Sequence, residues 1–272
     1  MTTDKRKIFF TDLDGTLLDD KKQIGHRTYE ALEAFTKAGN LLVLSSGRDI
    51  NNLKEFKEKM GLHFPSIYLT GYNGGQIYDC DNGITLYRNG LRIEQAIFII
   101  ETALMMDIHC HTYNETHIIT PTAGKEFKYY QRSVNTPVIH TRDLAAVISE
   151  KPYKCIAIDL KNQTKLNKLR KKVLSAYDDI SCMFSCPVYL ELFPSSSGKG
   201  AALVKLCEIL GIPVTNSIAA GDAENDLSML EAAGYGIAMV NGADSLKVIA
   251  DYVTRDDNNN DGLFEKICSI VS

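Results

Sequence analysis

Short apolar runs alternate with segments of helical periodicity at both ends of this chain, and no other feature restricts its fold as strongly. The alternation begins near the amino terminus and returns after residue 200. The expected strands are residues 8–10, 41–44, 67–69, 218–220 and 236–239, and the expected helices are residues 28–38, 51–60, 201–210 and 227–233. A strand–helix–strand rhythm predicts a mainly parallel sheet with helices on both faces. We therefore expect an α/β fold whose Rossmann-like core is built from both ends of the chain.

The middle of the chain follows a different pattern, with strand pairs and longer helices. A helix is expected where Ile93, Ile97, Ile100 and Leu104 recur at three- and four-residue spacing as one apolar stripe. The other expected elements are a hairpin around Asn114 and Glu115, a strand at 155–160 and a helix at 164–177. The expected organisation is an inserted α+β domain at residues 83–190 within a core formed by residues 1–82 and 191–272.

The 272 residues carry a formal net charge of −4, and acidic and basic residues are interspersed. No block of like charge indicates binding to nucleic acid or to an anionic membrane, so a small molecule is the expected partner. The seven cysteines lack the paired spacing of a zinc ribbon or a disulfide scaffold and are interpreted as reduced thiols. Because no apolar run resembles a signal peptide or a membrane span, we expect a cytoplasmic protein, either a monomer or a small homo-oligomer.

Two aspartates follow the first apolar run, in the sequence IFFTDLDGTLL. In an extended chain, residues two positions apart face the same side, so Asp12 and Asp14 would project together. They would do so at the carboxyl end of a parallel strand, where ligands of such sheets bind. Gly15 allows the backbone to turn sharply there. The alternative interpretation is an ordinary Asp-Gly turn, in which the Asp14 side chain bonds the nearby backbone.

A second acidic cluster, GDAEND, follows the expected strand at 218–220. A helix N-cap would explain Asn225 and Asp226 but leaves Asp222 without a role. If the two strands share a sheet, Asp222 converges with the first two aspartates at one edge. Three carboxylates at one point need a cation, and ligation by oxygen atoms alone favours a hard divalent ion, here Mg²⁺.

Two further segments offer groups that bind anions. Ser46, Gly47 and Arg48 follow the expected strand at 41–44 and supply a hydroxyl, a backbone N–H and a guanidinium group. Lys199 lies between two glycines at the start of an expected helix, where the helix dipole favours negative charge. The alternatives are a Ser/Gly turn with an exposed arginine and a solvated lysine. The lysine segment lacks the spacing of a Walker A motif.

Taken together, the segments DLDGTL, LSSGR, SGKG and GDAEND resemble, in order and context, the four motifs of the Mg²⁺-dependent phosphatases of the haloacid dehalogenase superfamily. The segment TGYNGGQIYD and the large insertion between the second and third motifs resemble the Cof-type subgroup, also called subclass IIB. Ser46 stands where this subgroup usually has threonine, and it retains the hydroxyl group. The resemblance implies hydrolysis of small phosphomonoesters, with sugar phosphates favoured, and a cap formed by the insertion.

The resemblance also implies a role for each matched residue. Asp12 is the expected nucleophile that forms an aspartyl-phosphate, and Asp14 is the expected acid and base. The expected catalytic set is Asp12, Asp14, Ser46 and Lys199. The expected metal ligands are Asp12, Asp222 and the backbone carbonyl of Asp14, with Asp226 orienting them. The expected contacts to phosphate and substrate are Ser46, Lys199, Asn225, the backbone N–H groups of Leu13 and Gly47, Arg48 and Asn73.

The insertion itself is less informative. The candidates to contact the leaving group, each of which is more often a plain surface or core residue, are Tyr113, Tyr129, Arg132 and Lys154. Two pairs lack further ligands and are interpreted as packing or surface residues, namely His109 with His111 and Cys182 with Cys186. Two other functions stay open at this point: a phosphomutase of the same superfamily, and a phospho-acceptor signalling module that gathers similar residues at a sheet edge.

Overall fold

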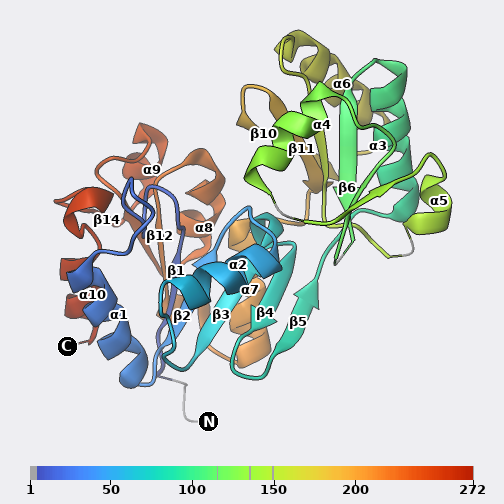
Figure 1. Cartoon of the computed structure of the whole chain (residues 1–272). Helices are drawn as coiled ribbons and strands as arrows, with labels where there is room; N and C mark the ends of the chain where they lie inside the picture. The colour runs from blue at the N-terminus through green and yellow to red at the C-terminus, as the bar shows by residue number, and fades with distance from the viewer. Residues whose placement is uncertain (1–4, 115, 135, 149, 272) are drawn as a thin grey trace. The chain divides into compact units, whose positions relative to one another are not determined.

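The structure is a computed structural model that describes residues 5–114, 116–134, 136–148 and 150–271 (Figure 1). The chain divides into two compact units. The core unit comprises the residues up to Arg88 and those from Ser197 onward, and the cap unit comprises Asn89–Ser196. Each unit has its own sheet and its own hydrophobic cluster, so each is described by itself.

The strands of the core unit are β1 (Ile8–Thr11), β2 (Leu41–Ser45), β3 (Ile67–Gly71), β4 (Gln76–Asp79), β5 (Ile84–Arg88), β12 (Ser217–Gly221), β13 (Tyr235–Ala238) and β14 (Tyr252–Val253). Within the described residues they form an eight-stranded sheet in the order β14-β13-β12-β1-β2-β3-β4-β5. The strands from β14 to β3 run parallel, whereas β4 and β5 extend the sheet in antiparallel fashion. The predicted α/β core with a mainly parallel sheet is confirmed.

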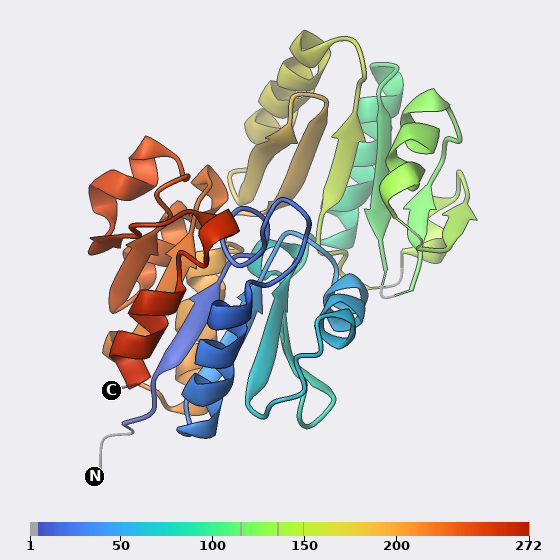
Figure 2. The same cartoon turned by 60° about the vertical axis from the view of Figure 1, so that its left-hand side comes forward.

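Helices cover both faces of the core sheet (Figures 1 and 2). They are α1 (His26–Lys37), α2 (Ile50–Lys59), α7 (Lys199–Leu210), α8 (Leu227–Ala232), α9 (Asp244–Ile249) and α10 (Phe264–Val271), joined by short 3-10 turns η1 (Tyr72–Gly74), η3 (Val214–Asn216), η4 (Glu224–Asp226) and η5 (Asn258–Asn260). Phe9 and Leu42 pack in a cluster with α1, α2 and α10, while Phe10 and Val43 pack with α7, α8 and α9. Burial on both faces explains why these strands read as continuous apolar runs.

Strand β1 lies at the centre of the core sheet and joins the two ends of the chain. Ile8 pairs with Leu41 of β2 on one side and with Ser217 of β12 on the other. Because all three strands run parallel, their carboxyl ends meet at one edge, which is where a ligand binds in open α/β sheets. The first and fourth sequence motifs are therefore brought side by side by strand pairing alone.

The strands of the cap unit are β6 (His109–Tyr113), β7 (Ile118–Thr120), β8 (Val138–His140), β9 (Cys155–Ile158), β10 (Ile180–Cys186) and β11 (Tyr189–Pro194). Its helices are α3 (Ile93–Met105), α4 (Lys125–Tyr130), α5 (Leu144–Val147) and α6 (Gln163–Ala176), with a 3-10 turn η2 (Gln131–Ser133). Within the described residues the strands form one sheet in the order β10-β11-β9-β6-β7-β8. Strands β6 and β7 pair antiparallel, as predicted, although residue 115 of their connection lies outside the described residues.

The two faces of the cap sheet differ in chemistry. One face, with Cys110 and Leu190, packs in an apolar cluster with α3 and α6. The opposite face carries His109, His111 and Tyr113. The two histidine rings contact aromatic side chains of α4, and the Tyr113 ring contacts His111. The predicted stripe on α3 is shifted, because its fully buried side chains are Ala96, Ile99, Ile100 and Ala103, while Leu104 is partly exposed.

The boundaries of the units fall a few residues later than the sequence-based boundaries at residues 82 and 190. Strand β5 pairs with β4 and so belongs to the core sheet. Strand β11 pairs with β9 and β10 and so belongs to the cap sheet. No disulfide joins the cysteines of the described residues. Among the described residues, no helix combines the length and the apolar character needed to cross a membrane.

Candidate active site

Asp12 is the first residue after β1, and its backbone fixes it to the neighbouring strand. Its N–H donates to the carbonyl of Ala220 at 3.0 Å, which continues the ladder between β1 and β12 by one residue. Gly15 then turns the chain with a φ of +89°, and a Cβ at that position would lie only 2.5 Å from Oδ2 of Asp222. Glycine is needed here both for the left-handed backbone and for the approach of this carboxylate.

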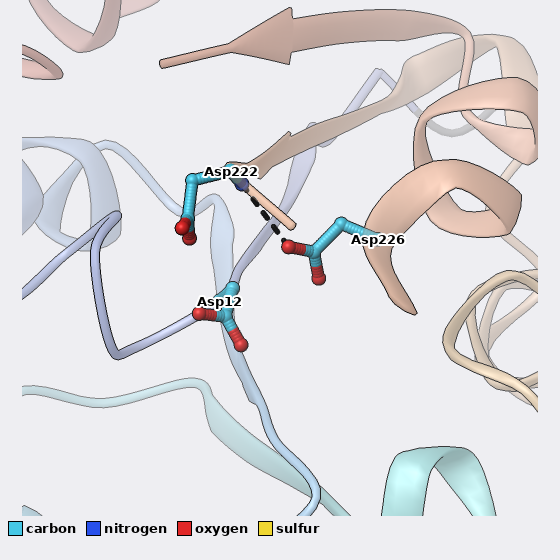
Figure 3. A group of neighbouring side chains, drawn as sticks. All are labelled: Asp12, Asp222 and Asp226. Atoms are coloured by element: carbon cyan, nitrogen blue, oxygen red, sulfur yellow. Dashed lines mark hydrogen bonds between the residues drawn. The ribbon is translucent and has the colours of Figure 1, made fainter. Parts of the chain in front are cut away.

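Three carboxylates converge at this edge of the core sheet (Figure 3). Oxygen atoms of Asp12, Asp222 and Asp226 all lie within 4.8 Å of one another, and this is the only such cluster of potential metal ligands among the described residues. Asp222 directly follows β12 and accepts a hydrogen bond from the Thr16 hydroxyl at 2.7 Å. Asp226 is fully buried, and its Oδ2 accepts from the backbone N–H groups of Asp222 and Ala223, each at 3.1 Å.

Lys199 is the first residue of α7, and its side chain is completely buried. Its ammonium donates to Oδ1 of Asp12 at 2.5 Å and to Oδ1 of Asp226 at 2.6 Å. Burial alone would lower the pKa of Lys199, but the two carboxylates raise it above its usual value. The interpretation of this residue as a solvated lysine at a helix start is therefore wrong, because it lies inside the carboxylate cluster.

The cluster carries more negative than positive charge. Burial raises the pKa of Asp12, the Lys199 ammonium opposes this effect, and the neighbouring carboxylates of Asp226 and Asp222 add to it. Burial also raises the pKa of Asp222, although the Thr16 hydroxyl acts in the opposite direction. A single ammonium cannot neutralise three carboxylates, and removal of charge from water is costly unless the charge is paired. The donor set fits a hard divalent cation, because it consists only of oxygen atoms.

Asp14 lies in a different environment from Asp12. Its carboxylate is partly exposed and accepts from Lys22 Nζ on one oxygen and from Arg48 Nη2 on the other, both at 2.7 Å. Partial burial would raise the pKa of Asp14, but the hydrogen bonds and charges of Lys22 and Arg48 lower it. Sequence analysis missed Lys22, because the lysine belongs to an irregular exposed segment with no motif of its own.

The segment from Ser46 to Arg48 follows β2 and lies beside β3 at the same edge of the core sheet. The Ser46 N–H donates to the Thr70 carbonyl at 2.9 Å, and the Ser46 hydroxyl accepts from the Arg48 N–H at 3.3 Å. Asn73 adopts a left-handed backbone conformation with a φ of +53° and donates from its N–H to the Ser46 carbonyl at 3.1 Å. A Cβ on Gly47 would lie 3.1 Å from the Asn73 side-chain oxygen. The residues Ser46, Gly47, Arg48 and Asn73 thus lie close together in the core unit.

The two remaining predicted residues of the core unit are Leu13 and Asn225. Leu13 is fully buried in the cluster of β1, and its carbonyl accepts from the Leu18 N–H at 2.8 Å. Asn225 is half-buried in the 3-10 turn η4, between the carboxylate residues Asp222 and Asp226.

A family model of haloacid dehalogenase-like hydrolases matches residues 9–267, that is, both segments of the core unit and the whole cap unit. The chain belongs to this family. The expected resemblance to its Cof-type subclass IIB is confirmed. The chain is 31% identical to the 5-amino-6-(5-phospho-D-ribitylamino)uracil phosphatase YwtE of Bacillus subtilis, with 93% of this chain and 94% of that protein covered.

Two further relatives agree with the family. The chain is 29% identical to the pyridoxal phosphate phosphatase YbhA of Escherichia coli, and the alignment covers 99% of each protein. A crystal structure of a haloacid dehalogenase-like hydrolase from Bacteroides thetaiotaomicron is 30% identical and superposes with a TM-score of 0.85 over 97% of this chain and 99% of that one. The similarity therefore covers both units.

In this haloacid dehalogenase-like hydrolase, the four cap residues named from the sequence fall into two classes. Tyr113 and Lys154 are buried, at 5% exposure each. Lys154 pairs with the buried Glu191 at 2.8 Å. Tyr129 is 45% exposed, and the exposed Arg132 guanidinium lies 5.9 Å from the centre of its ring. Only the second pair presents its side chains at the surface of the cap unit.

The two histidines of β6 belong to a buried chain of hydrogen bonds. The Thr122 hydroxyl contacts His109 Nδ1 at 2.6 Å, His109 Nε2 contacts His111 Nδ1 at 3.0 Å, and His111 Nε2 contacts the Tyr113 hydroxyl at 3.1 Å. Tyr113 in turn contacts the hydroxyl of Tyr130. Every ring nitrogen of the two histidines therefore has a hydrogen-bond partner within the cap unit.

Proposed function

We propose that this haloacid dehalogenase-like hydrolase is a Mg²⁺-dependent phosphatase that hydrolyses small phosphomonoesters through an aspartyl-phosphate on Asp12. One observation carries the proposal: the carboxylate of Asp12 lies at the edge of the sheet against the buried ammonium of Lys199 and within 4.8 Å of carboxylate oxygens of Asp222 and Asp226. Bound Mg²⁺ would act with the Lys199 ammonium to favour the ionised form of Asp12 against the effects of burial and of the neighbouring carboxylates. An ionised carboxylate fixed in this position would be aligned for attack on phosphorus.

Asp12, Asp222 and the backbone carbonyl of Asp14 would hold the Mg²⁺ ion. When bound, the ion supplies positive charge that offsets the excess of carboxylates and the charge of the phosphoryl group. Asp226 suits an orienting role, because its two oxygen atoms already accept from Lys199 and from two backbone N–H groups. Asp14 suits a carbonyl contact, because its carboxylate is engaged by Lys22 and Arg48.

The reaction then divides into two displacements. A carboxylate oxygen of Asp12 forms a bond to phosphorus, and the bond from phosphorus to the alcohol oxygen breaks. Asp14, which enters this step protonated, donates its proton to that oxygen, and the carboxylate that results is the form that Lys22 and Arg48 bind. In the second step a water molecule attacks the phosphorus, Asp14 takes its proton, and the bond to Asp12 breaks to release phosphate. The ammonium of Lys199 holds the Asp12 carboxylate in place during both steps.

The phosphoryl oxygens need hydrogen-bond donors in addition to the metal ion. We assign this role to the Ser46 hydroxyl, Lys199, Asn225 and the backbone N–H groups of Leu13 and Gly47, with Arg48 and Asn73 nearer the substrate. The gathering of Ser46, Gly47 and Asn73 in one hydrogen-bonded turn supports this assignment. These donors would be in position to stabilise the negative charge on the equatorial phosphoryl oxygens in the transition state.

The substrate class follows from the relatives and from the exposed residues of the cap. Two relatives are named for the phosphate esters of a ribitylaminouracil and of pyridoxal, both small metabolites with a ring. Tyr129 and Arg132 offer an aromatic face and a cation at the surface of the cap unit. We therefore propose small phosphorylated metabolites, sugar phosphates or ring-bearing esters among them, as the substrates.

A phosphate-release screen tests the proposal. Sugar phosphates, pyridoxal phosphate and flavin mononucleotide are incubated with the protein and Mg²⁺, and Asp12→Asn serves as the control that retains the fold. Release of phosphate over many turnovers by the parent, and none by the variant, is expected. Isomerised substrate without phosphate release would replace the proposal with a phosphomutase, and a stable phosphoprotein without turnover would replace it with a phospho-acceptor module.

A further inference from the structure

An irregular segment that we call the flap, Gly15–Ile24, connects Asp14 to helix α1. Isolated bridges join Leu18 to Asp14 and to Ile24, and the flap ends in a tight turn. In that turn the Lys22 N–H donates to the Asp19 carbonyl at 3.0 Å, and Lys22 has a left-handed backbone with a φ of +61°. This turn directs the Lys22 ammonium onto Asp14 at 2.7 Å. The flap therefore supplies Lys22, one of the two cationic side chains that bind the Asp14 carboxylate, and Arg48 is the other.

Three asparagine side chains bind the backbone of the flap, and two of them come from the polar loop RDDNNNDG near the carboxyl terminus. Asn258 Nδ2 donates to the Leu18 carbonyl at 2.8 Å, and Asn259 Oδ1 accepts from the Asp20 N–H at 3.0 Å. Asn241, from the loop after β13, donates from Nδ2 to the Gly15 carbonyl at 2.8 Å. In Figure 2 the blue flap lies beside this red segment.

The asparagines are themselves held in position. The Asn258 N–H donates to Asn241 Oδ1 at 3.3 Å, so the two side chains that bond the flap carbonyls are linked to one another. Asp257 Oδ1 accepts from the Asn259 N–H at 3.0 Å and fixes the turn that presents them. An amide suits this position because it both donates and accepts, whereas a carboxylate has no proton to give to a carbonyl oxygen.

We propose that Asn241 and Asn258 are positioning residues for the hydrolysis, because they hold the flap so that Lys22 stays against Asp14. The inference rests on the proposed function, and it adds residues that contact neither substrate nor metal. Without them the flap loses its anchors at Gly15 and Leu18, and the Asp14 carboxylate loses a fixed partner. A displacement of about an ångström at such a group lowers the rate substantially.

The test compares Asn258→Ala with Asn260→Ala, a matched control in the same turn. The Asn260 side chain donates from Nδ2 to Asp257 Oδ1 at 2.8 Å, within its own loop. The first readout is limited trypsin digestion, since Lys21 and Lys22 are exposed on the flap and the fragments are identified by mass. Cleavage at these lysines should be roughly fivefold faster or more in Asn258→Ala, and unchanged in Asn260→Ala. Flap cleavage does not depend on activity, so it separates this inference from the proposed function.

The second readout is kcat for phosphate release. Asn258→Ala should lower kcat roughly tenfold with little change in KM, and Lys22→Met should do the same. The double variant should be no slower than Lys22→Met alone, since the asparagine acts through that lysine. Asn241→Ala should also cause faster flap cleavage and a lower kcat. It replaces Asn258→Ala in the test if that variant does not fold.

Three results would overturn the inference: parent-like flap cleavage in both asparagine variants, faster cleavage with unchanged kcat, or full additivity with Lys22→Met. If Asp12→Asn still released phosphate, the proposed function would fail instead. The digestion would still report whether the asparagines hold the flap in position.

Discussion

The core unit and the cap unit both bury ionisable side chains, but they balance them differently. In the core unit, Lys199 faces the buried carboxylates of Asp12 and Asp226, with Asp222 beside them. In the cap unit, the buried Lys154 pairs with the buried Glu191 at 2.8 Å. Buried charge that is paired one to one serves packing, whereas an excess of one sign is costly and marks a place where a counter-ion binds. The balance of buried charge therefore distinguishes the functional site from the scaffold.

The histidines of the cap unit extend this contrast to neutral groups. Burial lowers the pKa of His109 to about 4, and burial together with the neighbouring His109 and Lys154 lowers that of His111 well below its usual value. A neutral imidazole has one donor and one acceptor nitrogen, so donation runs in a single direction along the chain from Thr122 to Tyr130. The chain of hydrogen bonds from Thr122 to Tyr130 therefore satisfies these buried histidines without net charge.

The contrast between the core unit and the cap unit would fail if a carboxylate of the core unit were not needed for activity. Asp12→Asn keeps the shape of the side chain and removes the attacking oxygen. We expect kcat to fall by roughly 10⁴-fold or more, because no other described group lies where it could replace the nucleophile. Phosphate release measures the effect, with thermal unfolding as the control for folding. Turnover near the parent rate would rule out Asp12 as the attacking group.

Removal of the metal ion tests whether the excess negative charge of the carboxylate cluster requires a cation. Chelation should lower the rate by roughly 10³-fold or more, and added Mg²⁺ should restore it, since the ion contributes several kcal/mol to the transition state. Mg²⁺ should also stabilise the fold, by about 3 kcal/mol at a hundred times its Kd. Asp222→Asn should abolish this stabilisation, whereas the cap variant below should retain it. Full activity in excess chelator would contradict a metal site.

The paired charges of the cap unit should respond in a different way. Lys154→Met leaves Glu191 buried without its cation, and we expect the free energy of unfolding to fall by about 3–5 kcal/mol. The double variant Lys154→Met/Glu191→Leu should recover most of this loss, because neither charge then remains in the interior. Urea denaturation measures both values. A single variant as stable as the parent would show that this pair is not a balanced unit.

The smallest effect is expected on acidification. The pKa of His109 is about 4 in the folded protein and 6.5 as an ordinary value, so the unfolded chain binds a proton that the folded chain does not. Stability is complete above pH 6.5 and falls as the pH decreases toward 4, by up to about 3 kcal/mol for this residue. His109→Gln should flatten the dependence on pH relative to the parent and to the exposed control His63→Gln. An unchanged slope would mean that His109 is protonated in the fold.

Local patterns predicted the strands that end at Asp12, Ser46 and Asp222, because two-sided burial gives continuous apolar runs and parallel pairing gathers their ends. The order of the motifs then identified Lys199. What the sequence could not supply were contacts between irregular segments, such as Lys22 with Asp14 or Asn258 with Leu18. Neither periodicity nor spacing encodes such pairs, because they depend on how the turns are oriented in the folded chain.

The insertion of the cap unit also has a consequence for the order of folding. One edge of β1 pairs with β2, which follows it closely in the chain, and the other edge pairs with β12. The pair between Ile8 and Ser217 can therefore form only after β12 has been synthesised. On a growing polypeptide, all strands of the cap sheet emerge before β12, and one edge of β1 meanwhile exposes unpaired N–H and C=O groups. Contacts so distant in sequence form slowly. The active site thus forms only after the whole cap unit has been synthesised, since no nascent chain that stops before Asp222 can bring its carboxylate to Asp12.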